Sequence, residues 1–380
     1  MTGRKVLLVC MFDSIHTAHW IERFKGSEIH FRLIPSKIHK RIHPKIIQLI
    51  KENQNVNLST PLWKFSYAVH GYLDYLLDKL LLKLFGYNYR LALLRKIVLL
   101  EKFDYIHALE IQGAGYLCDE LTIPDGSQLV VTNWGSDIYF YKNDPIHAAR
   151  IEHLLSKADR YSAECIRDYK LAREFGFKGI ELPVVPNSGG NYDLVPYLKS
   201  AKQDLVVVKT YGGVFGRGDL AIGAIEKLLA QNNTYFVYFY SVGFDNLRAV
   251  KELKNRYPLR IGFSTVHKSI SHENLMDLFQ RAKIYLGCSE SDGISTSFLE
   301  AISNGVYPIQ TSTSCADEWV SNGIHASIVG LNQDEISREL IRVASTWDSL
   351  SNEIHNNLRI ARNLLSPQKI AAMSREFYQN

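Results

Sequence analysis

The residues that decide the fold are a short apolar run and the polar segment that follows it. The run reads IYLGC (284–288), and the chain continues as SESDGISTSFLEAISNGVYPI (289–309). The run predicts a buried strand, the turn around Gly293 ends it, and a helix is expected over 295–304. A strand, a turn and a helix leave free backbone N–H groups at the carboxyl edge of a sheet, where open α/β sheets bind ligands. The helix start, with the hydroxyls of Ser295 and Thr296, therefore predicts an anion site.

The same alternation of strand and helix extends in both directions from this segment. Expected strands cover 5–10, 29–33, 104–107, 128–132, 159–163, 181–185, 205–210, 235–240, 283–288 and 306–310. Expected helices in the second half cover 217–231, 244–256, 271–281 and 295–304, and residues 332–365 are also expected to be helical. Alternating strands and helices form parallel sheets with crossover helices. The sequence therefore predicts an α/β fold with two doubly wound, Rossmann-like domains.

A change in composition marks the boundary between these domains. The stretch LPVVPNSGG (182–190) combines two prolines, two glycines and small polar residues, as linkers do. We therefore expect an N-terminal domain over 1–190 and a C-terminal domain over 191–366. A last helix is expected over 367–380, because Pro367 is tolerated at the first position of a helix.

Composition excludes several classes of protein. The 380 residues are 46% hydrophobic and 22% charged, which is ordinary for a folded chain and excludes disorder and coiled coil. No run of about 18 apolar residues occurs, so we expect no membrane-spanning helix, and the apolar start of the chain fits a first strand better than a signal peptide. The five cysteines form no Cys-x-x-Cys pair, which argues against a zinc cluster or a disulfide framework and for a reducing compartment.

Two carboxylates and a glycine-rich loop accompany the expected anion site. Asp292 and Glu300 lie about two helical turns apart, so both can accept hydrogen bonds from the hydroxyls of one elongated ligand. Residues 209–218 read KTYGGVFGRG. In this loop Gly213 and Gly216 let the backbone approach a phosphate, and Arg217 can bind it through two N–H groups. No Gly-Lys-Ser/Thr is present, so the loop is not of the Walker type. The combination predicts a sugar nucleotide as the ligand.

An acidic residue eight positions before a glutamate, as in Asp292 and Glu300, followed by Leu-Glu-Ala-Ile and a Gly-x-x-Pro turn, is a specific pattern. It resembles the signature of retaining GT-B glycosyltransferases of family 4, the glycosyl transferases group 1. The resemblance implies that Asp292 contacts the hydroxyls of the donor sugar and Glu300 the ribose, with Glu290 as a rival to Asp292. In the first loop of its C-terminal domain, the family has Gly-Arg and then Lys-Gly. Arg217-Gly218 is similar to the second element, and Lys209 stands for the first.

The resemblance also implies a function and an architecture. We expect two facing domains with a donor cleft between them, and a last helix that crosses back to the N-terminal domain. The implied reaction moves a hexosyl group from a UDP- or GDP-sugar to a hydroxyl acceptor with retention, in bacterial surface-polysaccharide assembly. Catalysis would come from Arg217 and Asp292, and the backbone amides over 293–295 would stabilise the leaving diphosphate. The expected donor-binding set is Lys209, Gly213, Gly216, Arg217, Asp292, Gly293, Ile294, Ser295, Thr296 and Glu300.

A second function stays open at this point. A degenerate GT-B relative could act as a binding or scaffold subunit. The first glycine loop has lost its glycine, Trp134 stands at a histidine position of the family, and Asp292 replaces glutamate. No Asp-x-Asp motif or cluster of metal-ligand residues is present in the sequence, so we expect no metal and no cofactor besides the donor substrate.

Four residues of the N-terminal domain are candidates for the acceptor side. Ser14 and His16 follow the first strand in DSIHTAHWI (13–21), which resembles the first loop of the family. Asp137 lies in VTNWGSDI (131–138), which is similar to a Thr-x-His-Gly-x-Asp segment, and His107 ends an earlier strand. Each has a structural alternative, with Ser14 and Asp137 as helix caps and the histidines as hydrogen-bonding groups of the fold.

The net charge of +5 is unevenly distributed. Residues 25–102 hold 14 Lys and Arg against 5 Asp and Glu, and leucines and tyrosines alternate with cations over 40–102. This pattern fits a surface resting on anionic lipid headgroups, or an amphipathic helix pair that covers a sheet. No nucleic-acid-binding module is recognisable. The expected partners are a nucleotide sugar, a carbohydrate or lipid-linked saccharide acceptor and an anionic membrane surface. The expected location is the cytoplasm, with peripheral association at the inner face of the membrane.

Overall fold

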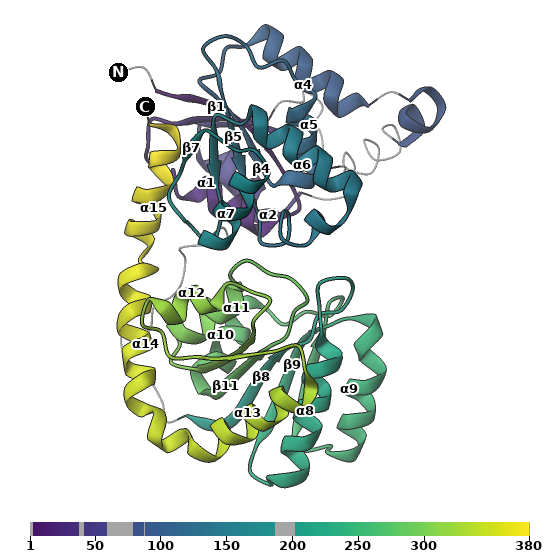
Figure 1. The fold of residues 1–380 in the computed structure, drawn as a ribbon, viewed down its shortest axis with the longest axis vertical. Helices are drawn as coiled ribbons and strands as arrows, with labels where there is room; N and C mark the ends of the chain where they lie inside the picture. Colours follow the sequence, from purple (N-terminus) through teal and green to yellow (C-terminus); the bar gives the residue numbers. More distant parts are fainter. Residues whose placement is uncertain (1–2, 38–41, 59–78, 87, 187–201, 380) are drawn as a thin grey trace. The chain divides into compact units, whose positions relative to one another are not determined.

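The computed structural model describes residues 3–37, 42–58, 79–86, 88–186 and 202–379 (Figure 1). The chain divides into two compact units. Unit 1 is Met1–Gly190 with Pro367–Asn380, and unit 2 is Asn191–Ser366. Each unit is built on one sheet whose described strands all pair in parallel, which confirms the prediction of two doubly wound α/β domains.

Unit 1 has the strand order β3-β2-β1-β4-β5-β6-β7. Its strands are β1 (Lys5–Cys10), β2 (His30–Pro35), β3 (Val56–Leu58), β4 (Tyr105–Leu109), β5 (Gln128–Thr132), β6 (Arg160–Ser162) and β7 (Ile180–Glu181). Apolar residues pack on both faces, because alternate side chains of the central strands point to opposite sides. One face is covered by α4 (Tyr89–Leu100), α5 (Tyr116–Asp119), α6 (Pro145–Lys157) and α7 (Ile166–Glu174). The other is covered by α1 (Ile15–Glu22), α2 (Pro44–Glu52) and α15 (Pro367–Arg375).

Unit 2 has the strand order β10-β9-β8-β11-β12-β13. Its strands are β8 (Gln203–Lys209), β9 (Phe236–Val242), β10 (Ile261–Thr265), β11 (Ala282–Gly287), β12 (Tyr307–Thr311) and β13 (Ser327–Val329). One face packs against α8 (Gly218–Gln231), α9 (Phe244–Arg256) and α13 (Gln333–Thr346). The other packs against α10 (His272–Arg281), α11 (Thr296–Ser303) and α14 (Ser351–Leu364) (Figure 1). The chain moves to one side of β8 through β9 and to the other side through β11, so the strand order reverses between β8 and β11.

The end of the chain packs into unit 1. After α15 a short 3-10 helix, η5 (Glu376–Tyr378), buries Phe377 and Tyr378 among aromatic residues of β2, β4 and α1. The Tyr378 hydroxyl accepts a hydrogen bond from Trp20 Nε1 at 3.2 Å. Ile370, Phe377 and Tyr378 therefore belong to the hydrophobic core of unit 1.

The basic region 40–102 divides into inward and outward residues where it is described. Within α4, Leu91, Leu94 and Ile97 are buried against the sheet. Leu99 and Leu100, at the end of the same helix, are 85% and 72% exposed. Residues 59–78, which include Trp63 and several tyrosines of this region, lie outside the described residues. Among the described helices, none has the length and the apolar character needed to cross a membrane.

Candidate functional site

The sequence-predicted site lies at the carboxyl edge of the sheet in unit 2. Strands β8, β11 and β12 are neighbours and run in parallel, so their last residues meet at one edge. The strand order reverses between β8 and β11, and open α/β sheets bind ligands at such a reversal. The glycine loop follows β8, and the segment with Asp292 follows β11. Two segments about 80 residues apart in sequence are thereby brought together.

Backbone contacts join the glycine loop to the segment after β11. Gly216 pairs with Ser289 as an antiparallel bridge, and the Glu290 N–H donates to the Phe215 carbonyl at 2.8 Å. A Cβ on Gly216 would lie 2.0 Å from the Tyr211 carbonyl oxygen, so only glycine fits there. Gly213 has a φ of +75°, and its N–H donates to Asp245 Oδ2 at 3.0 Å. The loop therefore has one fixed shape, which depends on both glycines.

Arg217 is held by two carboxylates at the start of α8. Its Nε and a terminal nitrogen donate to the two oxygens of Asp219, each at 3.1 Å, and its other terminal nitrogen donates to Glu290 at 3.2 Å. These hydrogen bonds, with Asp219 first, raise the pKa of Arg217 above its ordinary value. The guanidinium is about one third exposed, so it can also meet a ligand. Glu290, the rival to Asp292, is a partner of Arg217.

Lys209 and Asp292 lie together, as the proposed donor site requires. Lys209 Nζ is 4.0 Å from Asp292 Oδ2 and donates to Ser295 Oγ at 3.4 Å. The same ammonium lies 4.7 Å from the centre of the Tyr211 ring, which attracts cations. The side chains of Lys209 and Asp292 are both about one quarter exposed. A cation and a carboxylate therefore stand side by side next to the start of α11.

At the start of α11, the side chain of Ser295 caps none of the backbone N–H groups. Ser295 occupies the N-cap position with extended backbone, yet its hydroxyl makes no capping hydrogen bond. Instead it lies 3.5 Å from the Tyr285 hydroxyl and receives the Lys209 hydrogen bond. Ile294 is buried, and the Gly293 carbonyl accepts from the Cys315 N–H at 2.7 Å, which fixes the turn. With half-buried Thr296 as its first residue, this helix end is suited to an anion.

Glu300 is buried and has a partner that the sequence analysis missed. The carboxylate is 8% exposed, and its Oε1 lies 2.9 Å from Nε2 of His272. His272 is the first residue of α10, directly after the N-cap Ser271. The strand before this helix, β10, is not among the strands expected from the sequence. Once β10 is known, the start of α10 falls at the same carboxyl edge as the rest of the site.

In unit 1, Ser14 and His16 contact each other, and His16 also contacts Trp134. Ser14 is the N-cap of α1, and its hydroxyl accepts from the His16 N–H at 3.2 Å. The His16 ring packs edge-on against Trp134, with 5.5 Å between ring centres. Ser14 therefore has the capping role that the sequence analysis gave as its alternative.

His107 was predicted as an acceptor-side residue, and the structure corrects this. The side chain is completely buried, with Nδ1 at 2.6 Å from the Tyr378 hydroxyl and Nε2 at 2.7 Å from Thr132 Oγ1. Burial lowers the pKa of His107 to about 3, so the ring is neutral at physiological pH. Because both ring nitrogens already have partners inside unit 1, His107 holds the C-terminal segment to the sheet.

Asp137 organises two turns at the carboxyl edge of unit 1. Its Oδ2 accepts from the backbone N–H groups of Ile111 and Trp134, both at 2.9 Å. Burial and the nearby charge of Glu110 raise the pKa of Asp137 to about 8. Glu110 accepts in turn from the N–H groups of Gly113 and Ala114 at 2.7 and 2.6 Å. Both carboxylates thus stabilise the turn after β4.

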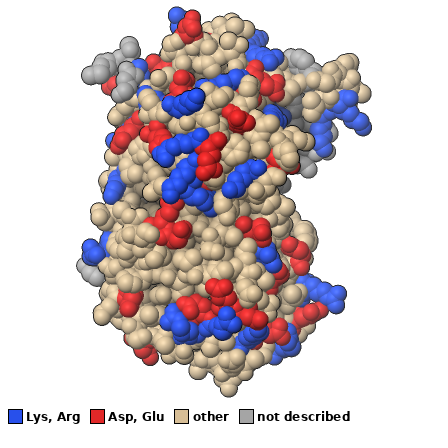
Figure 2. Space-filling view, viewed as in Figure 1, with Lys and Arg blue, Asp and Glu red and all other residues tan. Residues whose placement is uncertain are grey.

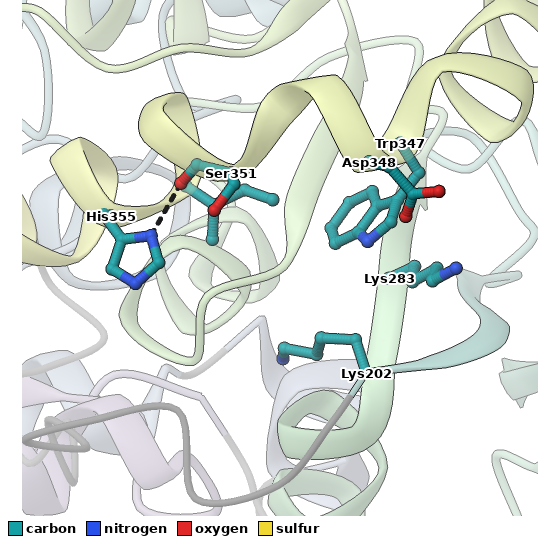
Figure 3. A pocket seen from close by; sticks show the side chains of 7 residues that line it. Lys202, Lys283, Trp347, Asp348, Ser351 and His355 are labelled. Atoms are coloured by element: carbon teal, nitrogen blue, oxygen red, sulfur yellow. Dashed lines mark hydrogen bonds between the residues drawn. The ribbon is translucent and has the colours of Figure 1, made fainter.

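A hollow of about 350 Å³ lies at the opposite, amino edge of the unit 2 sheet (Figure 3). Lys202 lines it and donates to the carbonyls of Phe279 and Asn304, at 3.1 and 2.7 Å. These carbonyls end α10 and α11, and helix C-termini attract cations. Lys283, also in its wall, pairs with Asp204 at 2.6 Å. The hollow is thus separate from the site at the carboxyl edge, and its two lysines hold the fold together.

Comparison with known proteins gives one family and one fold. Residues 219–359 match the family described as glycosyl transferases group 1. No curated protein sequence matches the chain. Among solved structures, HepE of Anabaena in complex with UDP and glucose is 14% identical with a TM-score of 0.70, covering 97% of this chain and 98% of its own. Sucrose-phosphate synthase of Thermosynechococcus elongatus is 13% identical with a TM-score of 0.64, covering 99% and 98%. At these identities the likeness concerns the fold.

Proposed function

We propose that this chain is a glycosyltransferase that moves a hexosyl group from a nucleoside-diphosphate sugar to a hydroxyl acceptor with retention of configuration. The proposal is supported by the match of residues 219–359 to the glycosyl transferases group 1 family and by the GT-B fold. The observation that carries the proposal is the set of charged residues on segments that meet at the carboxyl edge of one sheet: Lys209 beside Asp292, Arg217 beside Glu290, and the buried Glu300 on α11. HepE, which shares the fold, is described with UDP and glucose.

The site provides cations and N–H groups where a leaving diphosphate gains charge. Lys209 contacts Asp292 and Ser295, Arg217 is bound to Glu290 in the same loop, and the first N–H groups of α11 add the positive end of a helix dipole. Fixed donors that meet developing charge lower the barrier without reorganisation. In this mechanism the protein assists the leaving group, Asp292 holds hydroxyls of the donor sugar, and Glu300 holds the ribose. The proposal needs neither a histidine base nor an obligatory metal.

The test is nucleotide binding with a single carboxylate neutralised. Glu300→Gln should weaken binding of UDP or GDP by about 1–3 kcal/mol, because a charged acceptor of hydroxyl hydrogen bonds is replaced by a neutral one. Isothermal titration with both nucleotides measures this loss. Glu252→Gln on α9 is the matched control, since Glu252 is exposed and pairs only with its helical neighbour Arg248 among the contacts that the described residues make. Equal affinity in Glu300→Gln and wild type would remove Glu300 from the donor site.

We further propose that the acceptor is a saccharide carried on a lipid at an anionic membrane, as in bacterial surface-polysaccharide assembly. The support is two segments of unit 1, one before α4 and one at its end, that expose apolar side chains and carry cations. Together we call them the leucine surface, and its residues, 51–85% exposed, are Leu80, Leu82, Leu84, Phe85, Leu99 and Leu100. Lys79, Lys83, Arg95 and Lys96 are exposed between them. Figure 2 shows Lys and Arg side chains among uncharged ones where this part of unit 1 projects.

A further inference from the structure

The contact between His272 and Glu300 joins a buried carboxylate to an exposed ring. Glu300 is 8% exposed at its side chain, whereas the His272 side chain is 65% exposed. The two atoms that meet, Nε2 and Oε1, are 2.9 Å apart, which is a good hydrogen-bond distance. His272 can therefore respond to solvent while it holds one oxygen of a carboxylate that solvent barely reaches.

The fold fixes the place of His272. The Ser271 hydroxyl accepts from the Asn274 N–H at 3.2 Å and so defines the first turn of α10. Further along the helix, Leu275 and Phe279 are buried in the core beneath α11. The backbone of the first turn of a helix anchored in this way varies little in position. The hydrogen bond to Glu300 follows from packing on both helices.

We infer that His272 is a positioning residue for the donor nucleotide: by holding Glu300 Oε1 it leaves Oε2 oriented to accept from a ribose hydroxyl. This inference rests on the proposed function, because it assigns the ribose to Glu300. A carboxylate oriented before binding loses less rotational freedom when the ribose arrives. Removal of the imidazole should therefore weaken nucleotide binding even though the ring need not touch the ligand.

The same contact makes donor binding depend on pH. A protonated His272 forms an ion pair with Glu300 and withdraws negative charge from the oxygen that would accept from the ribose. Histidine is the side chain that changes charge between about pH 5 and 8. Affinity for the nucleotide should then be lower in acid than at neutral pH.

Other charged and titratable groups come from β8, β9, β11, the loop after β11 and α10. From β9 and β11, Tyr240 and Tyr285 lie close enough to feel the Glu300 charge, and burial raises the pKa of both above the ordinary value, so they stay neutral. From β8 and the loop after β11, Lys209 and Asp292 pair with each other at 4.0 Å. On α10 itself Glu273 is exposed.

The experiment is titration of UDP, and of GDP if UDP does not bind, at about pH 5.5 to 8 against wild type, His272→Ala and His272→Gln. Wild type should bind about 3- to 10-fold more weakly at the acid end. His272→Gln keeps a neutral N–H donor and should bind as wild type does at neutral pH, with a flat profile. At every pH tested, His272→Ala should bind about tenfold more weakly than wild type does at neutral pH.

The outcomes separate this inference from the function on which it rests. If His272→Ala keeps the affinity and the pH profile of wild type, His272 does not position Glu300, while the donor site stands. If His272→Gln is as weak as His272→Ala, a ring contact rather than an N–H donor is needed, and the inference is wrong. If the wild-type chain binds neither UDP nor GDP, the proposed function itself fails. Unfolding temperatures of the three proteins establish that each variant is folded.

Discussion

At the scale of single residues, the guanidinium of Arg217 has two carboxylate partners within its own unit. Asp219 and Glu290 hold it from two sides at 3.1 and 3.2 Å. These contacts keep the planar group in one orientation beside the glycine loop. A diphosphate carries more negative charge than either carboxylate, so it can attract the guanidinium without a large movement of the side chain.

Replacing Arg217 with alanine should lower turnover of the donor at least about tenfold, because one stabilising donor to the leaving diphosphate is lost. Release of UDP from UDP-sugar measures this change. Arg217→Lys, which keeps the charge but loses the fork of N–H groups, should fall between alanine and wild type. Both variants should unfold near the wild-type temperature, since exposed ion pairs contribute little stability. Turnover at the parental rate in Arg217→Ala would show that the loop does not serve the phosphate.

His107 gives a residue-scale prediction about acid stability. The folded-state pKa of His107 is lowered to about 3, whereas the unfolded chain has the ordinary value of about 6.5. Below about pH 6.5 the unfolded chain takes up a proton that the folded chain refuses, so stability falls by about 1.4 kcal/mol for each pH unit down to about pH 3. Above about pH 6.5 the His107 side chain is neutral in both the folded and the unfolded chain, so it causes no loss of stability there.

The titration of Asp137 changes the stability of the fold with pH in the opposite direction to that of His107. A variant is therefore needed to separate the two effects. The pKa of Asp137 is raised to about 8, and a group of this kind adds stability as pH falls from 8 toward its ordinary value of about 4. His107→Gln removes one of the two effects. The difference in free energy of unfolding between wild type and His107→Gln should shrink from about pH 6.5 to 4.5, measured by urea unfolding. A constant difference over this range would mean that His107 is not buried as a neutral ring.

At the scale of elements, the sequence predicted the central strands and the edge strand β7, and it missed the other three edge strands of the two described sheets. Central strands are buried on both faces, so β1, β4, β8 and β11 read as continuous apolar runs. The missed strands β3, β10 and β13 all stand at an edge of their sheet. They are short or partly exposed, and their side chains alternate less clearly between apolar and polar.

This difference also decided which site residues were predicted. Lys209, Arg217 and Asp292 follow strands that the sequence revealed, and parallel strands carry the residues after them to one edge. His272 follows β10, the edge strand that was missed, so its place at the same edge became visible only in the fold. His107 failed for another reason. Its two partners, Tyr378 and Thr132, come from other elements, one of them 271 residues away, and no local pattern reports such contacts.

The C-terminal segment provides the element-scale prediction. Tyr378→Phe should lower the stability of unit 1 by about 1–3 kcal/mol, because the hydroxyl that serves both His107 and Trp20 is removed while these buried groups remain. Tyr378→Ala should cost about 3–5 kcal/mol, since a large buried ring is lost as well. Thermal unfolding followed by tryptophan fluorescence measures both. If Tyr378→Phe unfolds at the wild-type temperature, the segment does not depend on this hydrogen bond.

At the scale of the whole molecule, the charge of the chain is concentrated where the apolar surface is exposed. Residues 25–102 carry a net charge of +9 from 14 basic and 5 acidic residues, whereas the chain as a whole carries +5. Helix α4 has buried residues on one side and exposed apolar residues at its end. Its inner residues pack on the sheet, and its outer end leaves Leu99 and Leu100 to solvent beside Arg95 and Lys96. The interpretation as an amphipathic helix that covers a sheet therefore holds for the inner face of α4, and the interpretation as a lipid-binding surface stays a prediction for its exposed end.

Neutralising the cations of the leucine surface should abolish binding to anionic membranes and leave the donor site unchanged. Each Lys or Arg near an anionic surface contributes about 1 kcal/mol, and salt screens the attraction over about 8 Å at physiological strength. The test is co-sedimentation with vesicles with and without anionic lipid, at low and high salt. The test variant replaces four cations with glutamine: Lys79, Lys83, Arg95 and Lys96. The matched control does the same to four cations of unit 2: Lys227, Arg248, Lys251 and Arg256.

A second variant, Leu99→Ser with Leu100→Ser, should weaken binding at both salt concentrations, because burial of apolar area is little affected by screening. Wild-type binding that is equal on neutral and anionic vesicles, or lost equally in test and control variants, would leave the leucine surface without a lipid partner and make the acceptor a soluble saccharide.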